Sequence, residues 1–171
     1  KAATSMFCMM YHRTQGFPVV VLRPFLTYGP FQRANMLVPY VITSALLNKP
    51  IKTTKGEQTR ELNYVSDIVD GFILAAIKKQ AIGHIINIGN GKEYQIRHVI
   101  KKILQLMNSN IEVDDSLPYR PGETMHFYCS NEKAKKLLGW QPKTSLEDGF
   151  RQTIAWYTEQ HNKGTLSNWL K

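Results

Sequence analysis

The sequence predicts an α/β protein in which two buried strands alternate with amphipathic helices. The chain has 171 residues, of which 43% are hydrophobic and 20% charged, enough for one domain with a core. Residues 17–22 and 84–88 are apolar runs without alternation, as in parallel strands buried on both faces. Because two parallel strands do not make a stable sheet, we expect them to extend a larger sheet that is absent from this sequence.

Periodicity and stop signals define the first elements. Residues 1–15 are predicted to form a helix that ends at Gly16. Its apolar residues cover more than one stripe, which favours burial on more than one side. The strand at residues 17–22 follows. Residues 36–47 then form a predicted helix, with Pro39 in the first turn, where a missing N–H costs little.

The middle of the chain is rich in turn signals. Residues 50–64 predict a small hairpin around residues 55–57. Ser66 is positioned to cap a helix over residues 67–78. The buried stripe of that helix is expected to contain Ile68, Phe72, Ile73 and Ile77.

The last part combines helices with a long loop. An amphipathic helix begins near Ile96, and residues 111–123 form a loop with one short strand. A short helix is expected over residues 131–138, and a capping-box pattern opens the last helix at Ser145. The tail after Asn162 has no pattern and is expected to be loose.

Composition argues against several classes of protein. No apolar run approaches the roughly 18 residues of a membrane span, and no leader-like segment follows the first residue. Two cysteines without a CxxC pair do not make a disulfide framework, so we expect a cytoplasmic protein that does not bind membranes. The five histidines lack metal-ligand spacing, so no metal site is expected. The net charge of +9 favours an anionic partner, although scattered basic residues also fit solvated helix faces.

The chain contains no self-contained catalytic motif. A phosphate-binding loop and a Ser-His-Asp pattern are absent, and Gly89-Asn90-Gly91 lacks the third glycine of a dinucleotide-binding turn. Polar residues gather instead at predicted strand ends and in loops, where α/β proteins bind ligands.

Four segments, taken in order, resemble one family. They are LRPFLTYGP at residues 22–30, GEQTRELNYVSD at 56–67, INIGNG at 86–91, and RPGE at 120–123 followed by NEKAKKLLGWQP at 131–142. They resemble the motifs of extended short-chain dehydrogenases/reductases, and among these the nucleotide-sugar epimerases and 4,6-dehydratases of the UDP-glucose 4-epimerase type. The resemblance implies the C-terminal substrate-binding lobe of an extended Rossmann-type enzyme.

This resemblance implies that substrate and cofactor bind mainly to different domains. Residues 1–162 would form the lobe that binds a nucleotide-diphosphate sugar, residues 163–171 a tail, and an N-terminal domain absent from this chain would bind most of the NAD. The intact enzyme would oxidise a sugar carbon transiently and then epimerise, dehydrate or reduce the sugar, and this chain alone would be inactive. Members of the family often pair through the helix at residues 1–15, which implies a homodimer.

The resemblance also assigns residues to the cofactor. Lys1 resembles the lysine of the catalytic Y-x-x-x-K pair, which holds the nicotinamide ribose and lowers the pKa of the tyrosine, since a nearby cation favours a phenolate. The tyrosine would lie four residues before it. The alternative is that Lys1 has no role beyond being the first residue. Pro24 and Phe25 resemble the stretch whose backbone meets the nicotinamide carboxamide, and Pro24 also fits a plain strand terminator.

The substrate residues follow in the same way. Arg60 and Arg120 match positions at the diphosphate, where a planar guanidinium suits phosphate oxygens; the alternative is surface ion pairs with Glu61 or Glu123. Thr27 would supply a hydroxyl. Beside the nucleotide base the resemblance places a short segment that equally fits plain helix core, consisting of Leu37, Val38 and Pro39.

Departures from the family pattern leave the base and the sugar open. Leu26 stands where the family often has an asparagine that binds the substrate phosphate, and Leu62 replaces an aromatic residue. Asn63 is polar where the family is apolar. The loss of the asparagine at position 26 is the best support for one alternative, a member that binds a nucleotide without catalysis. A basic nucleic-acid-binding module is a second alternative, but it would need a basic stripe interleaved with aromatics, and the motif order argues against it. We therefore expect no nucleic-acid partner.

Overall fold

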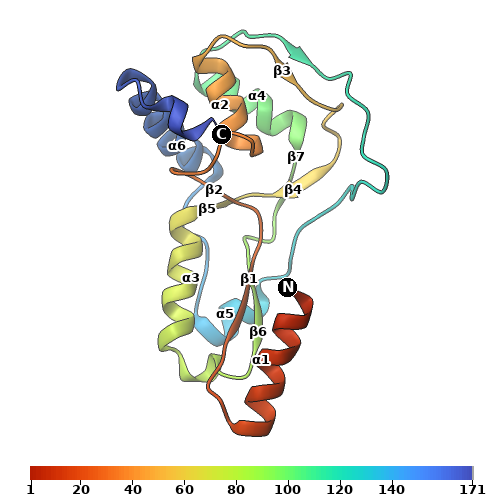
Figure 1. Cartoon of the computed structure of the whole chain (residues 1–171), viewed down its shortest axis with the longest axis vertical. Helices are drawn as coiled ribbons and strands as arrows, with labels where there is room; N and C mark the ends of the chain where they lie inside the picture. Colours follow the sequence, from red (N-terminus) through yellow and green to blue (C-terminus); the bar gives the residue numbers. More distant parts are fainter. Residues whose placement is uncertain (171) are drawn as a thin grey trace.

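The computed structural model describes residues 1–170, which form an elongated α/β molecule with two parts (Figure 1). The lower part in Figure 1 has two parallel strands with helices on both sides, and its elements are α1 (Ala2–Gln15), β1 (Val21–Pro24), α3 (Val65–Ile77), η1 (Lys79–Ala81), β6 (Ile85–Ile88) and α5 (Glu132–Leu138). The upper part contains the helices α2 (Leu37–Leu46), α4 (Ile96–Leu106), α6 (Leu146–Asn162) and η2 (Leu166–Trp169).

Strands β1 and β6 form the parallel pair that the sequence predicts. Their register runs from Val21 opposite Ile85 to Pro24 opposite Ile88, and Ile86 and Ile88 are fully buried. The α/β class is therefore confirmed. The first strand, however, begins later than predicted and includes its terminal proline, because only the residues opposite β6 find ladder partners and a proline is tolerated at a strand end.

The buried face of α3 differs from the prediction. Gly71 and Ala75 face inward, and a Cβ on Gly71 would lie 3.0 Å from Cγ2 of Ile88. Small side chains let the helix approach the strand closely, so the contact depends on residues that a hydrophobicity pattern undervalues. Of the predicted stripe only Ile68 is buried, while the exposed residues are Phe72, Ile73 and Ile77.

The predicted hairpin over residues 50–64 does not form. Its three short strands pair instead with distant segments: β3 (Ile51–Lys52) with β8 (Val113–Asp114), β4 (Thr59–Glu61) with β7 (Glu93–Gln95), and β5 (Asn63–Tyr64) with β2 (Thr27–Tyr28). The chain still turns at Gly56, where φ is 66°, but the backbone of Arg97 lies against this turn. Long-range packing therefore outweighs the local hairpin pattern.

The larger hydrophobic core lies between α2, α4 and α6. Ile103, Phe150 and Tyr157 are fully buried there. Helix α6 begins as its capping box predicts, because the Ser145 hydroxyl accepts a hydrogen bond from the backbone N–H of Asp148 at 3.1 Å. These three helices support the short strands on which the candidate site is built.

The start of α3 differs from the prediction. Ser66 does not cap α3, because the helix already begins at Val65, directly after β5.

The tail is not loose. Leu166 is 5% exposed, and the carbonyl of Trp169 accepts a hydrogen bond from the N–H of Ala34 at 2.8 Å. Apolar contacts and this bond hold η2 against the segment that precedes α2.

Helix α1 contains no buried residue. It ends at Gly16, as predicted, with a φ of 67°. Met6 and Phe7 are 74% and 59% exposed, so residues 1–170 do not provide the burial that the sequence favours. Helices α1 and α3 lie on either side of the β1–β6 pair in Figure 1, and both carry exposed apolar side chains.

The close packing of α3 on β6 gives a first prediction. Gly71→Leu should lower the free energy of unfolding by roughly 1–3 kcal/mol, because the added side chain has no space against Ile88. Ala76→Leu, on the exposed side of the same helix, should change it by less than about 0.5 kcal/mol. Urea unfolding of both variants measures the difference, and equal stabilities would show that α3 does not pack as described.

Candidate functional site

A cavity of about 400 Å³ opens where the two parts of the molecule meet. It lies between β2, the start of α2, β4 and the segment of residues 115–128, which we call the strap. The cavity is within the lower size range of small-molecule sites. Its lining consists of Leu26, Thr27, Tyr28, Gln32, Met36, Leu37, Val38, Thr53, Thr54, Gln58, Arg60, Leu62, Ile96, Leu117, Pro118, Arg120 and Glu123.

Five of the residues singled out in the sequence meet at this cavity. Thr27 comes from β2, Leu37 and Val38 from the first turn of α2, Arg60 from β4 and Arg120 from the strap. The Thr27 hydroxyl donates to the carbonyl of Phe25 at 2.9 Å, so its lone pairs remain to accept a bond. Val38 is 2% exposed, which means that it serves the core as well as the cavity wall.

The remaining predicted residues lie elsewhere. Pro39 is buried in the first turn of α2 and does not line the cavity. Pro24 is exposed at the carboxyl end of β1, and the ring of Phe25 stacks on Phe127 with centroids 5.1 Å apart. Lys1 is exposed at the start of α1. The cofactor residues therefore form no closed site with the cavity residues within residues 1–170.

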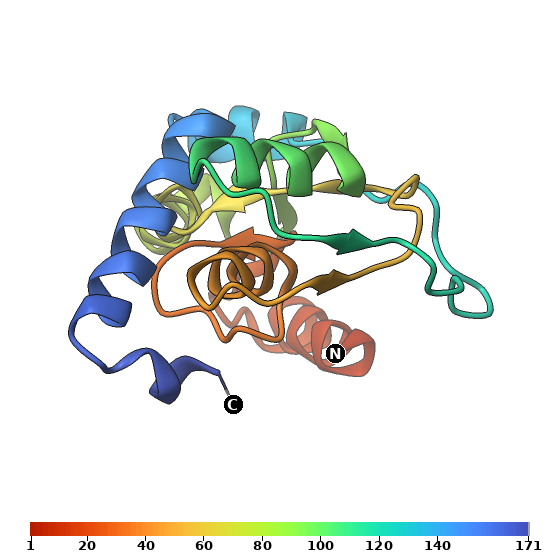
Figure 2. The same ribbon diagram turned by 90° about the horizontal axis from the view of Figure 1, so that it is seen from above.

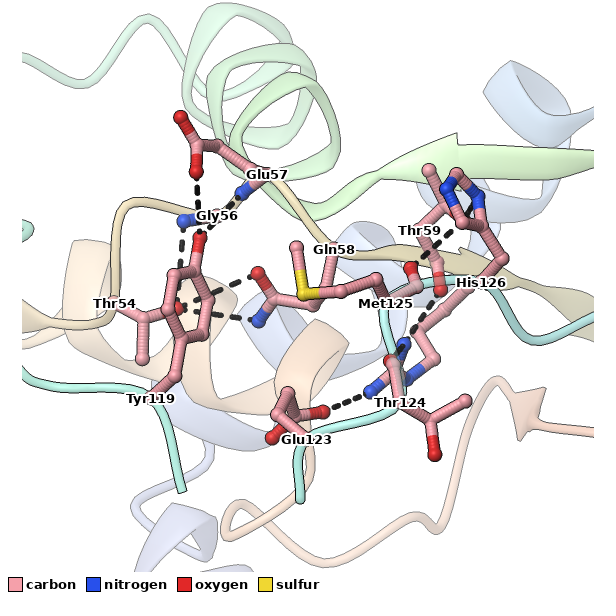
Figure 3. Close-up of polar contacts among 11 residues, drawn as sticks. Thr54, Gly56, Glu57, Gln58, Thr59, Tyr119, Glu123, Thr124, Met125 and His126 are labelled. Carbon is pink, nitrogen blue, oxygen red and sulfur yellow. Dashed lines mark hydrogen bonds and ion pairs between the residues drawn. The ribbon is translucent and has the colours of Figure 1, made fainter. Parts of the chain in front are cut away.

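The strap is fastened to β4 and to the turn before it (Figure 3). The N–H of Thr59 donates to the carbonyl of Met125 at 2.7 Å. The hydroxyl of Tyr119 donates to the carboxylate of Glu57 at 3.3 Å. Near its end, the ring of His126 lies 3.1 Å from the carboxylate of Glu93. These contacts hold the strap across the mouth of the cavity.

Hydrogen bonds also stabilise the charged form of Glu93. The hydroxyl of Thr59 donates to its carboxylate at 2.5 Å. This bond is the main reason why the pKa of Glu93 lies below its usual value, and the bond with His126 is the second. The group of three anchors the end of the strap. It lacks the geometry of a nucleophilic triad, because the same ring nitrogen, Nδ1, faces both the hydroxyl and the carboxylate.

Arg60 joins the strap to the cavity wall. Its guanidinium donates to the carbonyl of Thr124 at 2.7 Å and forms an ion pair with Glu123. Both charged side chains are 18% exposed. The ion-pair alternative from the sequence is thus realised for Arg60 and Glu123. The same guanidinium still lines the cavity, so the pair and a ligand contact are compatible.

Glu61 points to the opposite side of β4 and does not pair with an arginine. Its fully buried carboxylate accepts hydrogen bonds from the N–H groups of Cys129 and Gly91, at 2.8 and 3.2 Å. The pKa of the Cys129 thiol is raised to about 12, mainly by burial and in second place by the negative charge of the neighbouring Glu61 carboxylate. This cysteine is therefore an inert structural residue.

Arg120 is the second guanidinium at the cavity. It is exposed, and none of the ion pairs formed by residues 1–170 involves its side chain. Two arginines and one carboxylate, that of Glu123, therefore face the cavity from β4 and the strap. Such a site favours an anion with several oxygens, because each guanidinium offers a planar set of donors.

Sequence reasoning missed several cavity residues. Gln32 donates from its amide to the carbonyl of Thr27 at 2.7 Å, and Gln58 binds Thr54. Asp67, the last residue of the motif at residues 56–67, lies outside the cavity and accepts hydrogen bonds from the N–H groups of Lys143 and Thr144 at 3.2 and 3.1 Å. No local pattern marks the two glutamines, because their places depend on how distant segments meet.

Two features sought across residues 1–170 are not found. None of the helices there combines the length and the apolarity that crossing a bilayer requires. Within the same range, no three His, Cys, Asp or Glu side chains are grouped so that they could hold a metal ion.

Comparison with known proteins gives one consistent family. Residues 1–153 match the family model described as GDP-mannose 4,6 dehydratase. The human dTDP-D-glucose 4,6-dehydratase is 35% identical over 170 residues, which cover 95% of this chain and 48% of the relative. An uncharacterised protein of Methanocaldococcus jannaschii, MJ1055, is 32% identical over 160 residues, covering 93% and 48%. The chain thus spans about half the length of the curated relatives it matches.

Solved structures agree in fold. The UDP-glucuronic acid 4-epimerase of Bacillus cereus, solved with UDP-glucuronic acid and NAD, superposes with a TM-score of 0.85 at 31% identity, covering 93% of this chain and 51% of its own. The UDP-glucose 4-epimerase of Thermotoga maritima, solved with UDP-glucose, gives a TM-score of 0.87 at 27% identity, covering 94% and 52%. These similarities confirm the Rossmann-type fold that the motifs predict.

Proposed function

The chain belongs to the nucleotide-sugar epimerases and dehydratases of the extended short-chain dehydrogenase/reductase family, and on this basis we propose that it is the sugar-nucleotide-binding half of an NAD-dependent enzyme. In this proposal, residues 1–162 form the binding lobe. The reaction begins with transient oxidation of a sugar carbon and continues by epimerisation, dehydration or reduction.

One observation carries the proposal. Arg60 and Arg120, which lie 60 residues apart in the sequence, line one cavity of about 400 Å³. A sugar nucleotide carries a diphosphate with several anionic oxygens, and two guanidinium groups can bind these oxygens from two sides. The ion pair with Glu123 supports this role, because it fixes the position of Arg60 before a ligand arrives.

The apolar part of the cavity suits the nucleoside. Leu37 and Val38 lie at the start of α2 and offer an apolar surface to a base, while Pro39 is buried behind them and stabilises the first turn. Thr27 supplies an acceptor on the wall that β2 forms. In this arrangement the base lies against α2 and the diphosphate reaches towards the strap.

The residues proposed to meet NAD lie at the end of β1 and at the start of α1. Pro24 ends β1 and Phe25 follows it, at the carboxyl end of a strand, which is where open α/β sheets bind ligands. Lys1 would hold the nicotinamide ribose and favour the ionised form of a tyrosine. NAD supplies the capacity to accept a hydride from the sugar and return it. The pyrophosphate of NAD would bind mainly to a further domain.

A second candidate is a family member that binds a nucleotide without catalysis. Leu26 favours it, because its side chain lines the cavity where a polar residue would bind phosphate. The backbone carbonyl of Leu26 is occupied by the N–H of Asn63 at 2.9 Å. Binding of a sugar nucleotide without turnover in the NAD-loaded protein would favour this candidate.

We also propose a homodimer through α1. Met6, Phe7 and Tyr11 are 74%, 59% and 55% exposed on this helix, and apolar area of this kind marks contact sites. Sedimentation at micromolar concentration should show a dimer, and a variant with Phe7→Glu and Met10→Glu should be monomeric. A wild-type chain that sediments as a monomer contradicts the proposal.

The diphosphate role gives the main test. Arg60→Ala and Arg120→Ala should each weaken binding of UDP or dTDP by roughly 1.5–3 kcal/mol, as expected for a charge-assisted hydrogen bond. Their effects should not add, because both groups bind one ligand moiety. Calorimetric titration of the 171-residue chain measures both quantities.

Two controls separate binding from structure. Glu123→Gln removes the negative charge but leaves an amide oxygen that can accept the hydrogen bond from Arg60. Arg60 then stays in place without the repulsion between a carboxylate and the ligand, so nucleotide affinity should be retained or increased. Arg151→Ala removes an exposed arginine paired with Glu147 on α6, and affinity should not change. Unchanged affinity for UDP, CDP, GDP and dTDP in both cavity variants would refute the site.

A last prediction concerns NAD. The 171-residue chain alone should show no measurable affinity for NAD, because its sequence has neither a glycine-rich phosphate loop nor the acidic residue that binds a ribose. Calorimetry with NAD tests this, with circular dichroism to verify folding. Micromolar affinity would contradict the proposed division between the two halves.

A further inference from the structure

A second, larger cavity lies on the other side of the wall formed by Thr53 and Thr54. It is a groove of about 800 Å³ between α4 and the residues that follow or belong to the paired strands β3 and β8. Figure 2 shows β3 and β8 side by side, with α4 on one side of the pair. Its lining consists of Thr53, Thr54, Lys55, Glu57, Arg97, Ile100, Lys101, Leu104, Gln105, Asn108, Ser109, Asn110, Val113 and Asp115.

One end of this groove is cationic. The N–H of Arg97 donates to the carbonyl of Gly56 at 3.0 Å, which brings Lys55 beside the first turn of α4, and Lys101 follows one turn later. None of the ion pairs within residues 1–170 involves these three cations. Glu57, a carboxylate at the same end, already accepts the Tyr119 hydroxyl.

The other end is polar and uncharged, and an apolar floor joins the two. Ile100 and Leu104, on successive turns of α4, are 3% and 9% exposed. After the helix come the amides and the hydroxyl of residues 108–110, roughly 16 Å from Arg97 at the 1.5 Å rise of a helix. Asp115 is the second carboxylate in the lining.

We propose that this groove binds a nucleoside phosphate that ends in a free phosphate group, at a site separate from the proposed sugar-nucleotide cavity. NAD, whose two phosphates lie between two nucleosides, lacks such an end. The phosphates bind Lys55, Arg97 and Lys101. The base lies on the Ile100–Leu104 floor, and the amides at residues 108–110 form hydrogen bonds with its edge. The charged surface at one end of the groove, and the apolar and amide surfaces beyond it, match a molecule with phosphates at one end and a base at the other.

The test uses ATP as the probe and a background variant with Arg60→Ala and Arg120→Ala, which removes the proposed first site. ATP should still bind this variant of the 171-residue chain, as measured by calorimetry. Adding Arg97→Glu and Lys101→Glu should weaken binding at least about tenfold, which is about 1.4 kcal/mol. The control, Lys133→Glu with Lys136→Glu on α5, makes the same charge change away from the groove.

A second variant probes the base. Asn108→Gly removes one amide and suits the positive φ of 50° at this residue. It should weaken ATP binding and leave binding of inorganic pyrophosphate unchanged.

Three results would overturn the proposal: no ATP binding in the background variant, equal losses in the groove and α5 variants, or equal affinities for ATP and pyrophosphate. Stronger competition by a polyglutamate peptide than by ATP would also overturn it, in favour of an acidic protein partner. None of these results depends on whether Arg60 and Arg120 bind a sugar nucleotide.

Discussion

The guanidinium of Arg60 joins β4 to the strap, and the shape of the candidate site depends on this contact. It binds the carbonyls of Thr59 and Thr124 and the carboxylate of Glu123. Without it, the strap would be held mainly by backbone bonds and by the side-chain contacts of Tyr119 and His126 near its two ends. The strap brings Arg120 to the cavity, so the two arginines are coupled: one positions the segment that carries the other.

Strand alternation makes this arrangement possible. On β4, neighbouring side chains point to opposite faces, so Arg60 faces the cavity while Glu61 is buried. The Glu61 carboxylate is held by backbone N–H groups and lies so close to Gly89 that a Cβ there would be 2.0 Å from Oε1. The buried acid thus ties β4 to the end of β6. Through Arg60 on one face and Glu61 on the other, β4 therefore connects the cavity to the lower part of the molecule.

Local signals were sufficient for part of the fold. The capping box at Ser145 and the helix end at Gly16 are encoded in adjacent residues, and both are confirmed. The hairpin over residues 50–64 and the stripe on α3 were wrong, because strand partners and close helix packing depend on distant segments. At the site, motif resemblance brought together Thr27, Leu37, Val38, Arg60 and Arg120, but it gave no sign of the strap that joins them.

The ion pair of Arg60 with Glu123 need not compete with a diphosphate. A guanidinium has five N–H donors. Within residues 1–170, Nη1 of Arg60 donates to two carbonyls and Nη2 to Glu123, whereas its Nε–H forms no such bond. The Nε–H is thus left for a phosphate, which can bind there while the strap stays in place. The carboxylate of Glu123 would then act against an anion through charge alone. Arg120, which has no ion pair within the described residues, would offset that repulsion.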